Sequence, residues 1–557
     1  MLRTILALLF LTSATPALAG RPNLINSPCA NETLESRITE AIVDGTDKVW
    51  IFTGDGATTF MKNLDEIVIV GGGSAAWLAA ALLAHNTPEL KLTVVDKEVG
   101  TPVGVGEGTL LNFEIYLKRC GFSVDEWFTT IDATYKTAIL FPNWDREGND
   151  IWHPFFEPRS VAEGMPQVDA WTNCQHHDFR EYGSQFYDCN VTQDRVDLKQ
   201  PLGYHVDATK LVVFIKEKLK DKVTFIQSEM VTINRDSNQY VKSLVLKNGQ
   251  TITGDLFIDC TGFKSLLNQA PKRVNLDSRL FCDTAIAGHV PYIDREKEMH
   301  PYVRSEAVDH GWVWNIPVRT RIGSGLVFKR SITDIEDAKD YFVKYWDNRI
   351  QKENLKVIDW TPFYNENFWH ENVVSIGLAA GFIEPLESTG LVLIMEGMVC
   401  LLGRIRDHRY NDGDIELYNN VMKYYFEETI DFVSMHYAKS TRTTPFWNYV
   451  KEHRVPSERE LYYAELLKNP NKLIPNGCKD VGSYFSGESW GHWLIQLGYE
   501  VAPKKLPADA KTIEKLVIDT HTRNEKYRGT MSPMHHEAIE RLEALYNLPK
   551  PKAPMAT

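Results

Sequence analysis

The chain has 557 residues, of which 43% are hydrophobic and 24% charged, and its formal net charge is −13. This length exceeds one compact core and favours roughly two to four structural units, one of them large enough for an α/β domain. The acidic balance argues against general nucleic-acid binding, since proteins that bind the phosphate backbone usually present clustered lysine and arginine. The cysteines form no C-x-x-C pair and the histidines lack partners at ligand spacing, so no metal site is indicated.

The first twenty residues, MLRTILALLFLTSATPALAG, have the pattern of a secretory signal peptide: one arginine, an apolar run and Ala-Leu-Ala before Gly20. This run is too short and too interrupted to predict a stable membrane span. An alternative interpretation is that residues 1–60 are a leader-like extension without a catalytic part, and that the enzyme begins near Met61. The sequence leaves both interpretations open.

Residues 65–85, DEIVIVGGGSAAWLAAALLAH, run from a short β-branched strand through three glycines into an Ala/Leu-rich helix. This is the strand–turn–helix that a dinucleotide site needs. Gly71 permits the tight turn, Gly73 lets the backbone approach a pyrophosphate, and Ala76 fills the third position of the fingerprint. The start of the helix offers unpaired N–H groups and a favourable dipole for the phosphates.

A second predicted strand, KLTVVD, ends at Asp96, twenty residues after Ala76, where a carboxylate can accept hydrogen bonds from a ribose. A salt-bridged surface Asp96 is the alternative. Two further buried strands lead into glycine turns, within residues 254–263 and 372–390. Because FAD is held at its two ends by segments far apart in sequence, three such segments favour FAD over NAD.

The predicted fold class is therefore α/β, with a Rossmann-like FAD-binding domain whose sheet segments lie within residues 64–100, 240–265 and 370–390. An interleaved, largely helical substrate module is expected between these segments. We place the FAD-binding core with its interleaved substrate segments at residues 61–450 and a mostly helical substrate-side region at 451–557. The helices are predicted from apolar residues at three- and four-residue steps.

In GWVWNIPVR, residues 311–319, two tryptophans lie two positions apart. In a strand Trp312 and Trp314 point to one face, and Pro317 is expected to end the ladder. Taken by themselves, they are read as two core aromatics.

Several motifs in order, VGGGSAAW, VGEGTLLNFEIYL, ATYKTAI, FIDCTGF, GWVWNIP, GFIEPLESTG and STRTTPFW, resemble the flavin-dependent halogenases of the tryptophan halogenase family. The resemblance covers roughly residues 64–450. It implies that reduced FAD, dioxygen and halide form hypohalous acid, which passes through a tunnel to a separate aromatic substrate. No reductase domain is visible, so a separate flavin reductase is the implied partner.

The resemblance implies that Lys136, in ATYKTAI, hydrogen-bonds hypohalous acid or carries the halogen as a haloamine. A primary amine suits either role if burial lowers its pKa. Glu387 matches the family glutamate that orients the electrophile and accepts the ring proton. Glu384, three residues earlier, is expected to cap a helix or lie at the surface.

Other positions match family residues around the two sites. Ser388 is implied to couple the substrate side to the flavin side, and the backbone at Thr389 and Gly390 to form the halide pocket, where N–H groups can face an anion. His153 and Phe155 match residues that line the substrate chamber. A satisfied core histidine is the alternative for His153.

The sequence also departs from the family pattern. The strap VGEGT has Gly108 where alanine is more usual, which is expected to loosen it. Residues 481–503 contain no recognisable clamp for the amino-acid end of free tryptophan. An indole or another electron-rich aromatic is therefore the expected substrate, and the choice among chloride, bromide and iodide stays open.

The family signature W-x-W-x-I-P changes the interpretation of Trp312 and Trp314. The resemblance implies that these indoles lie near the flavin and keep organic substrates away from it.

The alternatives are an FAD-dependent aromatic monooxygenase, which needs an open cavity at the flavin and no Lys136, and a non-catalytic flavoprotein. Supply of reduced flavin favours the cytoplasm, whereas the leader pattern favours export.

Overall fold

The computed structural model describes residues 38–43, 49–53, 58–97, 106–155, 194–198, 201–268, 272–405, 407–475, 485–504, 515 and 533–548. The leader pattern of residues 1–20 lies outside them, so the signal-peptide interpretation stays a prediction. No helix in these ranges is long and apolar enough to cross a membrane. Residues 38–60 contain a three-stranded sheet of β1 (Ile38–Val43), β2 (Val49–Thr53) and β3 (Thr58–Phe60).

A six-stranded sheet forms the predicted nucleotide-binding layer. Its central strand β5 pairs in parallel with β6 and β16, so that Val70 lies opposite both Val95 and Asp259 and the carboxyl ends of the three strands meet at one edge. Four of the five β5 residues are buried, as expected for a strand covered on both faces. The order is β12 (Thr224–Gln227), β6 (Lys91–Asp96), β5 (Glu66–Val70), β16 (Leu256–Asp259), β25 (Val373–Ser375) and β24 (Trp369–His370).

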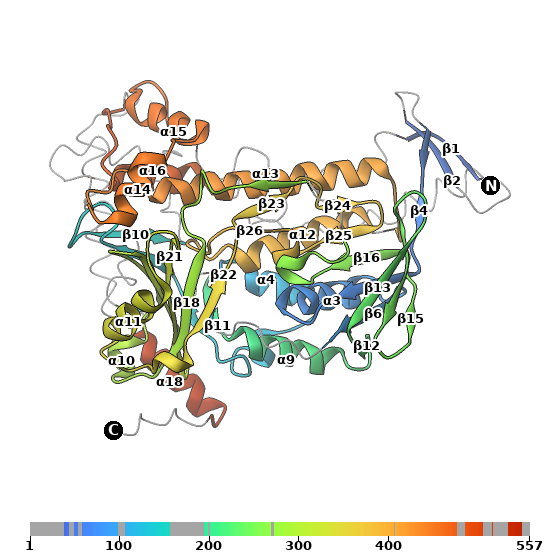
Figure 1. Cartoon of the computed structure of the whole chain (residues 1–557), viewed down its shortest axis with the longest axis horizontal. Helices are drawn as coiled ribbons and strands as arrows, with labels where there is room; N and C mark the ends of the chain where they lie inside the picture. The colour runs from blue at the N-terminus through green and yellow to red at the C-terminus, as the bar shows by residue number, and fades with distance from the viewer. Residues whose placement is uncertain are drawn as a thin grey trace.

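The three sheet segments predicted from sequence thus lie in one sheet, and its helices pack around α3 (Ser74–Asn86). This helix is rich in alanine, and the run from Ala76 to Ala84 is buried, which lets α9 (Ala208–Leu219) and α12 (Gly390–Arg404) approach it closely (Figure 1). Nearby are α4 (Asn112–Arg119), α5 (Val124–Trp127), η3 (Gly262–Lys264) and η5 (Gly377–Ala379).

A seven-stranded sheet, which the sequence did not predict, lies within the residues where interleaved substrate segments are expected. All its pairs are antiparallel except β9 with β19. The order is β10 (Asp150–Pro154), β9 (Ala138–Pro142), β19 (Tyr302–Val308), β20 (Gly311–Val318), β21 (Arg321–Phe328), β18 (Thr284–Val290) and β22 (Lys356–Asp359). Helices α10 (Arg295–Glu298), α11 (Ile335–Tyr345) and η4 (Lys352–Asn354) accompany it.

The expectation that Pro317 ends the ladder was wrong. Strand β20 continues through Pro317 to Val318, and Pro317 pairs with Ile322 of β21. The proline is tolerated because pairing with β19 stops at Asn315, so its missing N–H removes no bond on that side.

The described residues also form several smaller sheets. Sheet β7–β11–β8 brings the strap residue Gly108 and Lys136 to the same strand, β11. The remaining strands are β7 (Glu107–Gly108), β11 (Gly203–Val206), β8 (Thr134–Lys136), β13 (Met230–Arg235), β14 (Val241–Leu246), β15 (Thr251–Ile252), β17 (Arg273–Asn275), β23 (Phe363–Asn365), β26 (Gly381–Phe382), β27 (Arg409–Tyr410) and β4 (Lys62–Asn63).

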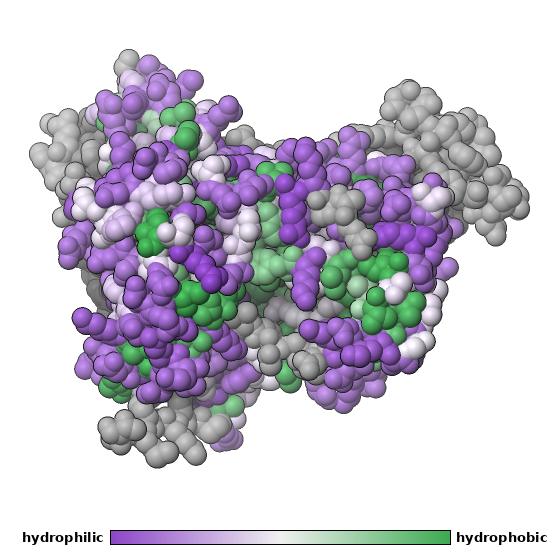
Figure 2. All heavy atoms as spheres, viewed as in Figure 1, coloured by the Kyte–Doolittle hydropathy of each residue, from purple (hydrophilic) through white to green (hydrophobic). Residues whose placement is uncertain are grey.

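The long helix α13 (Asp412–His436) runs beside the six-stranded sheet toward the side of the seven-stranded sheet (Figure 1). There it meets the C-terminal helices α14 (Pro445–His453), α15 (Glu458–Lys468) and α16 (Gly487–Gln496), and α18 (His535–Leu545) lies below the seven-stranded sheet. The face in Figure 2 is mostly hydrophilic, with separate small groups of apolar residues, one of them over β13–β15.

Candidate functional site

The glycine turn after β5 leads into a helix start with open space, which a pyrophosphate requires. Gly71 has a φ of +133°, and a Cβ there would lie 2.3 Å from the carbonyl oxygen of Cys260. Gly73 is the N-cap of α3, and among the described residues no other atom lies within 4 Å of the position of a Cβ. The observed turn therefore fits the cradle expected at Gly71, Gly73 and Ala76.

Asp96 ends β6 beside this turn. A Cβ on Gly72 would lie 1.9 Å from a carboxylate oxygen of Asp96, so only glycine allows the strand end and the turn to approach so closely. The acid therefore stands at the edge where the strands β5 and β6 end, as the ribose interpretation requires.

The loop Glu384–Thr389 carries the second group of candidate residues. It is tightly wound: the N–H of Leu386 donates to the carbonyl of Glu384, and that of Ser388 to the carbonyl of Pro385. Ser388 has a φ of 60°, a left-handed conformation that costs a non-glycine residue energy and that is concentrated at functional sites.

The loop leads directly into α12, whose N-cap is Thr389 and whose first residue is Gly390. No side chain caps this helix, a Cβ on Gly390 would meet no atom, and Oγ1 of Thr389 is buried without a partner among the described residues. A helix start with open space and an unused hydroxyl suits an anion such as halide.

Lys136 is completely buried, as its expected role requires. Its Nζ donates to Oγ of Ser388 at 2.7 Å and to the carbonyl of Thr109 at 3.1 Å, and lies 4.6 Å from the ring centroid of Phe155. Burial lowers its pKa to about 7, against the opposing charge of Glu387. At neutral pH the amine is therefore available in both its protonated and its neutral form.

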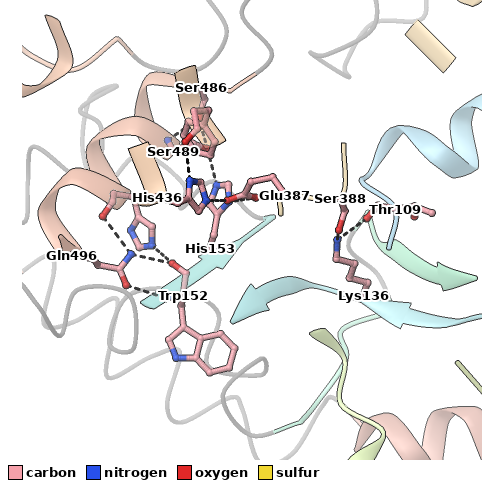
Figure 3. A network of polar contacts seen from close by, with 12 residues as sticks. Thr109, Lys136, Trp152, His153, Glu387, Ser388, His436, Ser486, Ser489 and Gln496 are labelled. Carbon is pink, nitrogen blue, oxygen red and sulfur yellow. Dashed lines mark hydrogen bonds and ion pairs between the residues drawn. The ribbon is translucent and has the colours of Figure 1, made fainter. Parts of the chain in front are cut away.

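Glu387, the residue before Ser388, is also buried and is held between two imidazoles (Figure 3). Nδ1 of His153 lies 2.8 Å from Oε2, and Nε2 of His436 lies 2.5 Å from Oε1. Burial raises the pKa of this carboxyl, but the charge and hydrogen bonds of the two histidines outweigh burial and lower it to about 2. Glu387 is thus an ionised carboxylate in an enclosed place.

Glu387 is itself one candidate catalytic group, and the next residue, Ser388, accepts a hydrogen bond from the other, Lys136 (Figure 3). Two consecutive loop residues therefore connect the two groups. The sequence reasoning found Lys136, Glu387, Ser388, His153 and Phe155 but missed His436. No local signal marks His436, since it ends a long helix and meets Glu387 only through packing of α13 on the loop.

Aromatic side chains enclose the Glu387 side of the site. The Trp493 ring centroid lies 3.8 Å from that of His436, and Phe432 stacks on Phe485 at 3.8 Å. His153 also contacts Oγ of Ser489 at 3.1 Å, so α16 lies against the site. This enclosure excludes water and strengthens the charge interactions of Glu387.

The expectation for Glu384 was wrong, because it neither caps a helix nor lies at the surface. It is 1% exposed, and its Oε2 accepts hydrogen bonds from Nε1 of Trp312 at 2.9 Å and from the hydroxyl of Tyr437 at 2.8 Å. Both glutamates of the loop are therefore buried, although Pro385 between them is exposed. Neighbouring residues at the end of α13, His436 and Tyr437, therefore hold Glu387 and Glu384 respectively.

Trp312 is fully buried, whereas Trp314 is half-buried, and their ring centroids lie 6.1 Å apart. A Cβ on Gly325 would lie 2.1 Å from the Trp314 ring, which therefore covers that glycine. The pair fills the space over β21 next to the Glu384 loop.

Comparison with known proteins identifies the family. The tryptophan halogenase family model matches residues 66–512. The chain belongs to this family. A tryptophan 6-halogenase from Streptomyces albogriseolus is 30% identical over 461 residues, covering 76% of this chain and 85% of that protein. A tryptophan 7-halogenase from Lentzea aerocolonigenes is 30% identical over 422 residues, covering 70% and 80%.

Solved structures agree with this assignment. The crystal structure of a tryptophan 6-halogenase from Streptomyces toxytricini has a TM-score of 0.78 at 27% identity and covers 86% of this chain and 100% of its own. A tryptophan halogenase from Shewanella frigidimarina has a TM-score of 0.77 at 26% identity, covering 88% and 99%. This halogenase is therefore a flavin-dependent oxidoreductase with the α/β fold of its family, and the monooxygenase alternative is not favoured.

Proposed function

We propose that this halogenase uses reduced FAD, dioxygen and halide to form hypohalous acid, which halogenates an electron-rich, indole-like aromatic at Lys136 and Glu387. The observation that carries the proposal is the joining of these two buried groups through Ser388, whose hydroxyl accepts from Lys136 while its neighbour Glu387 faces the aromatic enclosure. A direct oxygen transfer beside the flavin has no use for such a pair.

The cofactor would be held by the glycine turn at Gly71 and Gly73, by α3 from Ala76 onward, and by Asp96 at its ribose. When bound, reduced FAD and dioxygen supply the oxidant that converts halide to hypohalous acid. Thr389 and Gly390 would hold the halide at the start of α12, and Ser388 connects this end to Lys136.

Lys136 would receive the hypohalous acid. As ammonium it donates a hydrogen bond to the oxidant; as a neutral amine it attacks the halogen, forming an N–halogen bond and releasing water. A pKa of about 7 allows either course. Phe155, under the Nζ atom, excludes water from the group.

Glu387 would accept the proton from the ring carbon after halogen has added, since both its position and its ionised state suit a base. His153 would line the chamber through its bond to this carboxylate. The relatives from Streptomyces albogriseolus and Lentzea aerocolonigenes are tryptophan halogenases, but the absence of a recognisable amino-acid clamp in residues 481–503 favours an aromatic that lacks the amino-acid group.

Reduced flavin would come from a separate reductase, by diffusion or transient contact. This requirement favours a cytoplasmic enzyme. If residues 1–20 act as a secretory signal, the mature protein will lack them, and the mass of the protein purified from its source distinguishes the two cases.

The test supplies reduced FAD from a flavin reductase, with each halide in turn, to a panel of indoles, phenols and free tryptophan, and reads the products by mass. Halogenated indoles are expected. Gain of one oxygen independent of halide would contradict the proposal. Lys136→Ala should abolish halogenation while the variant still oxidises reduced FAD, whereas an unchanged product yield would remove Lys136 from the mechanism.

A further inference from the structure

His436, which the sequence reasoning did not identify, has an acceptor at each of its two ring nitrogens. Nδ1 lies 2.7 Å from the carbonyl oxygen of Phe432, one turn back on α13, and Nε2 lies 2.5 Å from Oε1 of Glu387. A carbonyl oxygen can only accept, so Nδ1 must carry a hydrogen. The Nε2 contact then needs a proton of its own.

That second proton lies between the imidazole and the carboxylate, at a distance typical of a short, charge-assisted hydrogen bond. Burial lowers the pKa of His436 below its usual value, and the hydrogen bond and the charge of Glu387 offset this only in part. The proton is required by the geometry, since both contacts of the imidazole are with acceptors. The carboxylate cannot use its other oxygen to compensate, because Oε2 is already bonded to His153. Removing the proton would leave two acceptors facing each other in a water-free place.

Aromatic rings around this imidazole offset part of the cost of burying its charge. The Trp493 ring lies 3.8 Å away by centroids, tilted by 47°, and the Phe141 and Phe432 rings lie at 5.1 and 5.2 Å. A cation beside an aromatic face is stabilised where water is absent. The other titratable groups near the pair are His153, which acts on both members, and Lys136 and His492, which feel the charge of Glu387. Burial keeps the pKa of His492 far below its usual value, so His492 adds no charge to the site.

We propose that Glu387 and His436 share one proton and work as a single base, with His436 as a positioning residue that keeps the carboxylate ionised and aimed at the ring. This inference rests on the proposed function of Glu387. When halogen has added to the ring, the ring C–H bond breaks, its electron pair restores the aromatic system, and the proton goes to the carboxylate. The pair then holds two protons and a net positive charge, which favours release of one of them.

The pH profile of halogenation tests the inference with His436→Gln. The amide can still donate a hydrogen bond to Oε1 but carries no charge. Since a nearby opposite charge typically lowers a carboxyl pKa by about one to three units, its loss should move the acid limb of indole halogenation to higher pH by a similar amount. With indole deuterated on its ring carbons, proton removal should also become slow enough to give an isotope effect that the wild type lacks.

The matched control is His492→Gln. His492 is equally buried, but its Nε2 bonds to the carbonyl of Trp152 and not to Glu387, so this variant should keep the wild-type acid limb. If the acid limb shifts equally in both variants, or in neither, the proposal of a shared proton is contradicted. If the wild type halogenates no aromatic at all, the proposed function fails instead, which separates the two outcomes.

A measurement on the wild-type protein covers the case in which His436→Gln does not fold. In protein labelled with ¹⁵N at histidine, one imidazole should keep both ring nitrogens protonated at about pH 8, where an unperturbed histidine is neutral. In Glu387→Gln this signal should disappear. A wild-type spectrum that contains only neutral imidazoles would overturn the inference.

Discussion

The indole N–H of Trp312 lies 2.9 Å from Oε2 of Glu384, which joins the W-x-W-x-I-P strand to the loop that carries Glu387 and Ser388. The hydroxyl of Tyr437 donates to the same oxygen at 2.8 Å. The tryptophan therefore has two functions in the fold: it fills volume, and it fixes the start of the loop by a buried polar bond. This bond explains why an indole, and not merely a large apolar ring, stands at position 312.

Glu384→Gln should make the protein more stable at alkaline pH. Burial raises the pKa of Glu384 from 4.5 to about 7, only partly offset by its hydrogen bonds. A raised carboxyl pKa gives stability that is complete below about pH 4.5 and is lost as pH rises through 7, in total about 3 kcal/mol. The amide oxygen can still accept from Trp312 and Tyr437. In urea unfolding, the free energy of unfolding of the variant relative to the wild type should rise between these pH values. A difference that does not change with pH would contradict this.

Replacing both tryptophans by alanine, Trp312→Ala with Trp314→Ala, should open the filled volume next to the loop. We expect more hydrogen peroxide release and more oxygenated product per reduced FAD consumed, with FAD binding retained, because the organic substrate or water then reaches the flavin. Trp312→Phe serves as control, since it keeps most of the volume but loses the bond to Glu384. If the double variant releases no more peroxide than the wild type and gives the same products, the two tryptophans are ordinary core residues.

Lys136→Met should change stability in a pH-dependent way that reports the state of the buried amine. Because burial lowers the pKa from 10.5 to about 7, the native state carries a costly buried ammonium below pH 7, and this cost, at most about 5 kcal/mol, disappears as pH rises from 7 to 10.5. Methionine loses the bonds to Ser388 and Thr109 at every pH. The gain of the variant over the wild type should therefore be largest near pH 6 and shrink toward pH 10 in unfolding titrations, whereas a flat difference would place the pKa of Lys136 near its usual value.

The sequence predicts the nucleotide-binding layer well for a physical reason. Strands Glu66–Val70 and Lys91–Asp96 have the predicted bounds because a buried parallel strand is a continuous apolar run, and the turn at Gly71 has a backbone requirement that only glycine meets. Motif resemblance found the candidate pair Lys136 and Glu387. The positions of these two residues relative to each other depend on tertiary contacts, which the motifs do not describe.

What sequence could not predict depends on contacts between distant segments. From its local sequence Glu384 looks like a surface acid. Its hydrogen-bond donors, Trp312 and Tyr437, are 72 and 53 residues away in the chain. In the sequence His436 looks like any other residue of a helix, and its contact with Glu387 arises only from the packing of α13 against the loop. The seven-stranded sheet escaped notice because short amphipathic and buried strands, such as Thr284–Val290, resemble buried helix segments by periodicity.

Gly108→Ala should lower halogenation, although the family resemblance implies alanine at this position of the strap. The strap was expected to be loose at this position, but a Cβ there would lie 2.6 Å from Oγ of Ser388 and 3.1 Å from Nζ of Lys136. Gly108 has no positive φ, so the effect comes from displacement and not from backbone strain. Because small misplacements of reacting groups are costly, we expect a loss of about tenfold or more, with oxidation of reduced FAD unchanged.

A double-variant cycle shows whether this loss runs through Ser388. In a Ser388→Ala background the atom nearest to the added methyl group is gone, so Gly108→Ala should cost much less than it does in the wild type. If the two losses simply add, the methyl group acts elsewhere, for example on Val303, whose Cγ2 would lie 3.1 Å away. A Gly108→Ala variant as active as the wild type would mean that Lys136 and Ser388 can shift together and keep their 2.7 Å bond, since that bond is the part of the site the methyl group threatens most directly.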